Sequence, residues 1–170
     1  MNKQLFDGDE WWPVETPVGR MVLIGNDDAL HRLHLPDDTQ GALFLQELPQ
    51  GRPGSVAKAE SQLHAYFAGE LTRFDVALEP QGTDWQRQVW AALAEIPYGE
   101  TRSYGDIARA VGNPRASRAV GMANNRNPIA LVIPCHRVIG ADGSLTGYGG
   151  GLPLKERLLA HERQVLAGTA

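Results

Sequence analysis

The chain contains one cysteine, Cys135, among its 170 residues. A single thiol cannot form an internal disulfide, and it cannot supply a zinc site built from several thiolates. The fold must therefore rest on a buried apolar core. The hydrophobic fraction of 42% and the charged fraction of 21% are those of a soluble globular protein, and the length suits one ordinary domain or two small ones.

The sequence has no segment that indicates export or insertion into a membrane. The first thirteen residues lack the apolar run of a signal peptide. The longest apolar segment, Pro128–Pro134, is far shorter than the roughly 20 residues of a spanning helix and is broken by prolines. We therefore expect a cytoplasmic protein with no membrane partner.

The first half predicts a small α/β domain over residues 1–80. Residues 21–25 and 29–35 are strand candidates joined by a turn-prone Asn-Asp-Asp segment, and residues 74–78 alternate as a third strand would. A helix with its apolar side chains at helical spacing precedes Gly69. The predicted sheet is mixed or antiparallel.

The second half predicts a mostly helical domain over residues 85–170, after a linker at residues 81–84. Thr83 or Asp84 is suited to cap a helix that ends near residue 96, and Ser103 is suited to cap a second over residues 104–111. A Gly-containing turn then leads to a third helix, residues 115–124. This order is typical of a winged-helix-like domain with a helix-turn-helix, so the fold class is α+β.

The third predicted helix combines small side chains with arginines, and it lies in the basic half of the chain. Residues 1–84 carry 14 acidic and 6 basic side chains, whereas residues 85–170 carry 6 acidic and 10 basic ones. Small residues permit close approach of the backbone, and arginine suits phosphates. Tight helix packing and a scattered surface charge are the alternatives, and we favour a helix pressed against DNA.

Cys135 and His136 follow a short apolar run and precede a glycine-rich loop, residues 140–151. A buried, inert thiol is the ordinary role of a lone cysteine. A reactive thiol must lose its proton, which a histidine base oriented by a carboxylate favours, and the sequence offers His136 and Glu162. On an extended strand adjacent side chains diverge, so contact between Cys135 and His136 requires a turn at Pro134 or a bridging water.

The segment Ile133–Val138 resembles the active-site signature of the O6-alkylguanine-DNA alkyltransferases, also called methylated-DNA–protein-cysteine methyltransferases. The resemblance covers nearly all of residues 84–163 in family order, whereas the first half resembles the family in size and layout only. The other matching segments are Trp85–Trp90, Ile96–Glu100, Ser103–Tyr104, Ser117–Gly121, Asn127–Pro128, Tyr148–Leu152, Lys155 and Leu158–Glu162.

The resemblance implies a role for each of five catalytic residues. Cys135 would accept the alkyl group in an in-line displacement. His136 would act as a base through a water molecule, and Glu162 would orient His136. Tyr104 would lie near the guanine ring and help to protonate it, and Asn127 would brace the turn before the reactive segment.

The resemblance also implies how DNA is bound. The third helix would enter the minor groove, and Arg118 would fill the space left by a base flipped out of the duplex. The other residues implied on this surface are Arg115, Ala116, Ser117, Ala119 and Gly121. The base pocket would be formed by Val138, Tyr148, Gly149 and Gly150, together with the backbone of Cys135.

The implied activity is a stoichiometric transfer that consumes the protein, because a thioether is stable and the chain has no second thiol. The expected partner is double-stranded DNA containing O6-alkylguanine. We expect a monomer with no cofactor, no metal and no required protein partner. Activity on O4-alkylthymine and cooperative self-association on DNA stay open.

Three other classes of protein compete with this interpretation. An alkyltransferase-like damage-recognition module would lack the cysteine. A winged-helix regulator would need base-reading side chains on a helix that here is mostly Ala, Ser and Gly. A cysteine hydrolase would need an oxyanion hole, which the sequence does not reveal.

Overall fold

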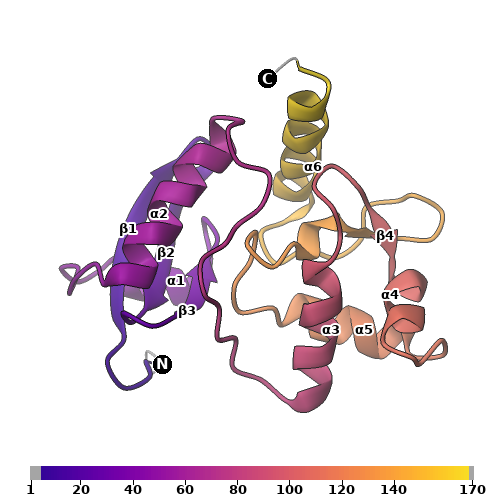
Figure 1. The fold of residues 1–170 in the computed structure, drawn as a ribbon, viewed down its shortest axis with the longest axis horizontal. Helices are drawn as coiled ribbons and strands as arrows, with labels where there is room; N and C mark the ends of the chain where they lie inside the picture. The colour runs from indigo at the N-terminus through magenta and orange to yellow at the C-terminus, as the bar shows by residue number, and fades with distance from the viewer. Residues whose placement is uncertain (1–4, 169–170) are drawn as a thin grey trace. The chain divides into compact units, whose positions relative to one another are not determined.

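The computed structural model describes residues 5–168, and the chain divides between Pro80 and Gln81 into two compact units (Figure 1). The first unit holds a three-stranded antiparallel sheet of order β1-β2-β3. Its strands are β1 (Glu10–Thr16), β2 (Gly19–Gly25) and β3 (Leu30–His34), and its helices are α1 (Thr39–Phe44) and α2 (Gly54–Phe67). With the helical second unit, this confirms the predicted α+β class.

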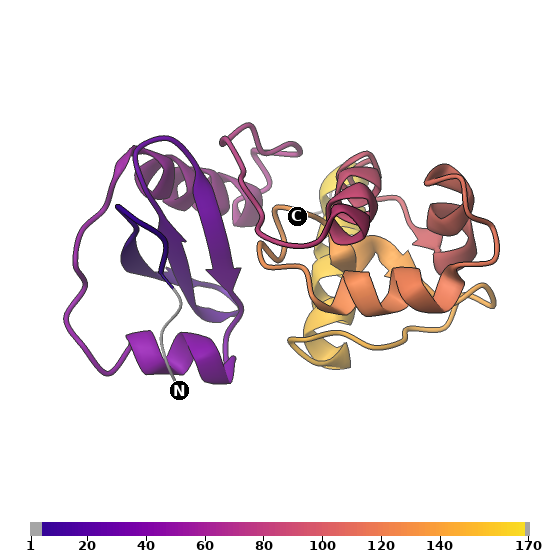
Figure 2. The ribbon, with the colours of Figure 1, turned by 90° about the horizontal axis from the view of Figure 1, so that it is seen from below.

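The two helices of the first unit cover opposite faces of its sheet (Figure 2). Phe44 of α1 packs into a cluster with Trp11, Val22 and Ile24, which share one face. Gly25 points to the other face, where a Cβ atom at its position would stand 2.7 Å from Ser55 Oγ of α2. Both faces of β2 are therefore buried from Met21 onward, which explains the unbroken apolar run Met21–Ile24.

The predicted strand at residues 74–78 is wrong. Only Leu78 joins the sheet, through one isolated parallel bridge to Leu30, in which Leu30 N donates to Ala77 O and Glu79 N donates to Leu30 O. Alternation alone was insufficient evidence, because Phe74 and Asp75 have no strand partner in the described residues.

The second unit is mostly helical and contains a short two-stranded parallel sheet. Helices α3 (Asp84–Ala94), α4 (Tyr104–Ala110) and α5 (Ser117–Asn125) contact one another, and α6 (Leu152–Leu166) contacts a 3-10 helix, η1 (Cys135–Arg137). The sheet pairs β4 (Arg102–Ser103) with β5 (Val138–Ile139). This places η1 and β5, which lie next to each other in the sequence, beside both α6 and the start of α4.

Side-chain caps fix where α3 and α4 begin. Thr83 and Ser103 each accept a hydrogen bond from the third residue of their helix, and Gln86 and Asp106 return a bond to the capping residue's N–H. Each reciprocal pair satisfies two backbone donors that would otherwise have no partner. Helix α5 has no such cap and begins at Ser117, two residues later than predicted, with Arg115 in the preceding turn.

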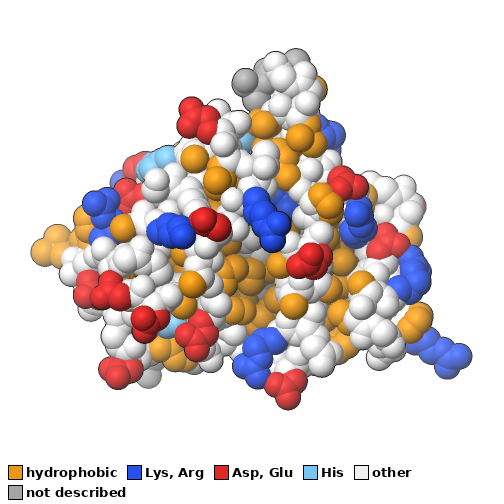
Figure 3. Space-filling model, viewed as in Figure 1, with side chains coloured by type: hydrophobic (Ala, Val, Ile, Leu, Met, Phe, Trp, Pro, Cys, Tyr) orange, Lys and Arg blue, Asp and Glu red, His pale blue; other side chains and the backbone are white. Residues whose placement is uncertain are grey.

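On the face drawn in Figure 3, acidic side chains are prominent over the first unit and Lys and Arg side chains over the second, as the sequence charges require. Within residues 5–168, no helix is long and apolar enough to cross a membrane.

Candidate active site

Cys135 is positioned by a series of tight turns and not by an extended strand. Leu131 adopts a left-handed φ of 70°, which is rare for a residue with a branched side chain. Pro134 (φ −80°, ψ 62°) then forms an inverse γ-turn, in which Cys135 N donates to Ile133 O at 2.8 Å. Of the two arrangements open to the sequence, the turn at Pro134 is therefore present.

Asn127 holds these turns together. Its Nδ2 donates to Ile133 O at 2.8 Å, and its Oδ1 accepts a hydrogen bond from Ile129 N at 3.0 Å. Both ends of the amide are thus used to span the segment that leads into η1. These contacts match the bracing role that the resemblance implies for Asn127.

His136 and Glu162 form a buried pair, and both side chains have no exposed surface. His136 Nε2 lies 2.7 Å from Glu162 Oε2. His136 Nδ1 is also buried but has no hydrogen-bond partner among the described residues. A direct bond from Nδ1 to Cys135 is therefore absent in the described structure, although the two residues are adjacent.

Arg137 forms an ion pair with Glu162 that the sequence did not reveal. Its Nε donates to Glu162 Oε1 at 2.8 Å and its Nη2 to Oε2 at 3.1 Å, while Nη1 donates to Ile96 O. Gly99 N adds a further bond to Glu162 Oε1. This bidentate contact makes Arg137 a buried structural cation, and not part of the expected basic surface.

The environment sets the protonation of the three groups. Burial raises the pKa of Glu162, but the hydrogen bonds from His136 and Arg137 outweigh it and lower this pKa below its usual range. Burial lowers the pKa of His136 and raises that of Cys135. At neutral pH the cluster therefore holds an ionised carboxylate, a neutral imidazole and a protonated thiol.

Lys155 is fully buried on α6, although a lysine side chain ordinarily lies on the solvent-facing side of a helix. Its Nζ donates to Val138 O and, at 2.9 Å, to Thr146 O. The ammonium thus ties α6 to β5 and to the glycine-rich loop. It also lies 6.0 Å from the centre of the Tyr148 ring.

Two of the predicted base-pocket residues, Val138 and Tyr148, lie beside Lys155. Val138 is buried, Tyr148 and Gly150 are half-buried, and Gly149 is exposed. The Tyr148 hydroxyl is buried without a hydrogen-bond partner in the described residues. Tyr104 is linked to the same loop, because its hydroxyl oxygen accepts a hydrogen bond from Thr146 Oγ1 at 3.0 Å.

The residues predicted to bind DNA lie on α5 or immediately before it. Arg115 and Arg118 are exposed, and Ala116, Ser117, Ala119 and Gly121 are half-buried. A Cβ atom on Gly121 would stand 3.7 Å from the ring of Tyr104, so the helix backbone passes close to that ring.

The surface cations near α5 differ from the other arginines of this region. Arg102 and Arg109 pair with Glu100 and Asp106, respectively. In contrast, Arg115, Arg118 and Arg126 are exposed and make no ion pair within residues 5–168. The unpaired positive charge of this region is therefore concentrated at the two ends of α5.

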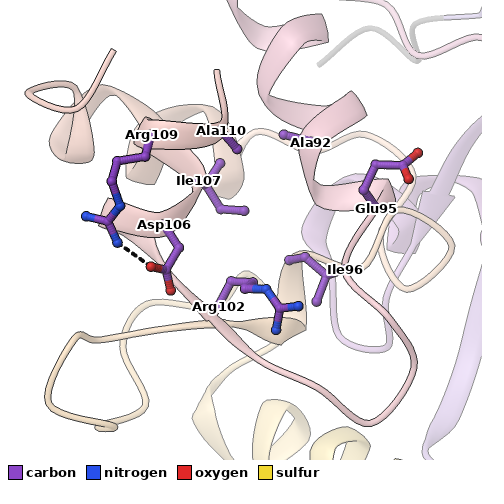
Figure 4. Close-up of a pocket in the computed structure, with 8 residues that line it drawn as sticks. All are labelled: Ala92, Glu95, Ile96, Arg102, Asp106, Ile107, Arg109 and Ala110. Atoms are coloured by element: carbon purple, nitrogen blue, oxygen red, sulfur yellow. Dashed lines mark hydrogen bonds and ion pairs between the residues drawn. The ribbon is translucent and has the colours of Figure 1, made fainter. Parts of the chain in front are cut away.

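Two surface cavities lie outside this cluster. One of about 280 Å³ opens between α3 and α4, over the apolar side chains of Ala92, Ile96, Ile107 and Ala110 (Figure 4). Another of about 180 Å³ lies beside β4 and the start of the glycine-rich loop. Neither is lined by Cys135 or Tyr148, so neither is the predicted base pocket. Among residues 5–168, no cluster of His, Cys, Asp and Glu could hold a metal ion.

Comparison with known families gives one result for both units. Residues 84–164 match the model of the 6-O-methylguanine DNA methyltransferase DNA-binding domain, and residues 13–80 match that of the ribonuclease-like domain of the same proteins.

Individual relatives agree. The methylated-DNA–protein-cysteine methyltransferase of Mycolicibacterium paratuberculosis is 54% identical over 157 residues, covering 91% of this chain and 93% of the relative. That of Methanosarcina acetivorans is 51% identical and covers 87% and 94%. The solved O6-methylguanine methyltransferase of Mycobacterium tuberculosis superposes with a TM-score of 0.82 at 50% identity, covering 92% and 93%. A solved complex of that organism's OGT with DNA gives a TM-score of 0.80 at 48% identity, covering 91% and 93%.

Proposed function

The chain belongs to the family of methylated-DNA–protein-cysteine methyltransferases, and on that premise we propose that it repairs DNA by moving the alkyl group of O6-alkylguanine onto Cys135. The observation that carries this proposal is the orientation of His136. An ionised Glu162 can only accept a hydrogen bond, so His136 Nε2 must carry the proton between them. The buried Nδ1 atom then has the free lone pair of a base.

The first step activates the thiol. Burial raises the pKa of Cys135, so the thiol needs a base at the moment of attack. His136 Nδ1 takes the thiol proton through a bridging water, and the ionised carboxylate of Glu162, held in place by Arg137, stabilises the resulting imidazolium. Asn127 fixes the turn that aims Sγ at the alkyl carbon.

The second step breaks the carbon–oxygen bond. The thiolate attacks the alkyl carbon, a carbon–sulfur bond forms, and the electron pair of the broken bond passes to O6 of guanine. Tyr104 supplies the proton that leaves guanine neutral. The product is a thioether at Cys135, and the chain has no second thiol to reverse it. Each chain therefore repairs one base.

The substrate reaches the site by base flipping. Cys135 is only 5% exposed, and a base within a duplex cannot approach a buried sulfur. Helix α5 enters the minor groove with its half-buried small residues, Arg115 contacts phosphate, and Arg118 fills the vacated space in the base stack. Val138, Tyr148, Gly149 and Gly150 enclose the extruded guanine. The second unit thus carries both DNA binding and alkyl transfer.

The test is direct analysis of the DNA product. A duplex with one O6-methylguanine is incubated with excess protein and digested to nucleosides, which are then quantified. We expect stoichiometric conversion of O6-methylguanine to guanine by the native chain and none by Cys135→Ser, which keeps the size of the side chain. Persistence of the lesion with the native chain, despite tight binding, would make this a damage-recognition protein instead.

A further inference from the structure

Helix α5 presents one exposed stripe whose chemistry the roles above do not fully use. Its exposed residues are Arg118, Met122 and Asn125, at spacings of four and three residues. Such spacings place side chains on one face of a helix. The opposite face is buried through Val120, Ala123 and Asn124. The stripe therefore points away from the core of the second unit, in the direction that Arg118 faces.

Met122 is the unexpected member of this stripe. It is 63% exposed, and its helical neighbours Gly121 and Ala123 have little or no side chain to screen it. It lies one turn beyond Arg118, about 6 Å along the helix axis. An apolar side chain thus lies in the sequence between the unpaired arginines Arg118 and Arg126. On a surface exposed only to water, a polar side chain at this position would be more favourable.

We propose that Met122 is an apolar wedge that packs against the base pair next to the flipped nucleotide. This inference rests on the proposed function, because it assumes that α5 occupies the minor groove. Methionine is one of the side chains that insert between base steps from that groove. Its flexible thioether adapts to different surfaces, so the contact tolerates any neighbouring sequence, as lesion repair requires. Arg118 fills the gap left by the flipped base, and Met122 keeps the adjacent step open.

The unpaired charges around Met122 identify duplex DNA as the occupant. Arg115 precedes α5, Arg118 lies on it and Arg126 caps its end, and these exposed cations would repel a second copy of the same surface. Duplex DNA carries phosphates that can pair with the arginines and apolar base faces that can pack against Met122. A protein with an acidic, apolar patch could also bind this surface, and the rate of methyl transfer from DNA distinguishes the two occupants.

The experiment compares Met122→Ala and Met122→Gln with the native chain. Gln has nearly the length of Met but is polar. Single-turnover methyl transfer is measured from a duplex containing O6-methylguanine, and benzyl transfer is measured from free O6-benzylguanine, which needs no contact with α5. We expect both variants to be slower on the duplex by about tenfold, the effect of losing a buried apolar side chain. The reaction with the free base should be unchanged.

Two controls define the role further. Leu48→Ala removes a side chain that is 88% exposed on the first unit and should leave both reactions at the native rate. Arg115→Ala should lower the slope of log affinity against log salt concentration by about one, because a phosphate contact is lost. Met122→Ala should leave that slope unchanged, since its contact is apolar.

A 2-aminopurine placed beside the lesion should become less fluorescent with Met122→Ala, as its stacking is restored.

The results separate failure of the inference from failure of the proposed function. Native rates for Met122→Ala on the duplex would overturn the wedge while leaving alkyl transfer intact. An equal decrease with duplex and free base would also overturn it, because the residue would then act on the fold. A native dimer without DNA that Met122→Ala dissociates would assign the residue to self-association. Absence of methyl transfer by the native chain from the duplex would overturn the proposed function itself.

Discussion

At the level of single residues, the proposed alkyl transfer depends on which nitrogen of His136 carries the proton. Glu162 lies 2.7 Å from Nε2, Arg137 keeps the carboxylate ionised, and the proposed mechanism assigns the role of base to Nδ1. The sequence predicted His136 and Glu162 through the resemblance. It could not predict Arg137 or Lys155 as buried groups, because charged side chains are ordinarily read as surface until their partners are visible. Those partners come from distant segments, such as Ile96 and Thr146.

Glu162→Gln tests this proton assignment. The amide of Gln can donate to Nε2, which favours the tautomer that carries the proton on Nδ1 and removes the base. We expect methyl transfer to slow by roughly 100-fold or more, as for loss of a general base. Binding to the damaged duplex should be retained. His136→Asn should slow methyl transfer by a similar factor, and the double variant should be only slightly slower, since the two residues act as a unit. Independent, multiplying losses would contradict the pairing.

The same groups predict how stability depends on pH. His136 and Glu162 both have pKa values below their ordinary ones, so each binds a proton less readily in the folded chain than in the unfolded chain. The free energy of unfolding should therefore decrease as pH falls below about 6.5, and decrease further below about 4.5. Urea unfolding at a series of pH values measures this. In Glu162→Gln, the unfolding free energy should fall less steeply below about pH 4.5, because the titrating carboxylate is gone. A stability that rises on acidification would exclude the assigned protonation states.

At the scale of helices, strands and loops, prediction succeeded where local signals agree. Thr83 and Ser103 marked the starts of α3 and α4, because a capping residue and an apolar repeat coincide there. It failed at β1, where Pro13 interrupts the run. That strand lies at the edge of its sheet, the position in which a proline is tolerated. The 3-10 helix at Cys135 also escaped prediction, since a single turn after Pro134 leaves no periodic pattern.

The cap of α4 provides a prediction at this scale. Ser103 also pairs with Ile139 in the short sheet, so its helix start fixes both the direction of α4 and the position of Tyr104. Ser103→Ala should cost about 1 kcal/mol of unfolding free energy. Thr83→Ala, which removes the matching cap of α3, should cost a similar amount. Urea titrations of the two variants check this, and a cost near zero for both would show that the caps contribute nothing.

Lys155 joins three elements, and its removal should loosen the glycine-rich loop. Lys155→Met keeps most of the side-chain volume but leaves Val138 O and Thr146 O without their donor. We expect a loss of about 1–3 kcal/mol in unfolding free energy. Transfer should slow equally from duplex and from free O6-benzylguanine, because the base pocket itself changes. A loss confined to the duplex reaction would place Lys155 in DNA binding instead.

At the scale of the whole molecule, charge is divided unevenly along the chain. The sum is −8 for residues 1–84 and +4 for residues 85–170, and three exposed arginines without ion pairs in the described structure, Arg115, Arg118 and Arg126, lie on α5 or beside it. Composition predicted this division but not its location, because Arg102, Arg109 and Arg137 contribute to the sequence charge yet are paired within the fold.

The small number of unpaired cations at α5 predicts a weak dependence of DNA affinity on salt. If Arg115 and Arg126 contact phosphates and Arg118 enters the base stack, the slope of log affinity against log salt concentration should be about −2. Fluorescence anisotropy with a labelled duplex over a range of NaCl concentrations measures it. A slope steeper than about −5 would require contacts from many cations outside α5.

The central claim is that Cys135 accepts one alkyl group per chain and keeps it. The most direct test is the intact mass of the protein after incubation with an excess of duplex containing O6-methylguanine, followed by mapping of the modified peptide. We expect a gain of one methylene per chain, located on Cys135, with no further repair once every chain is modified. An unchanged mass, or continued repair by an unmodified chain, would contradict it.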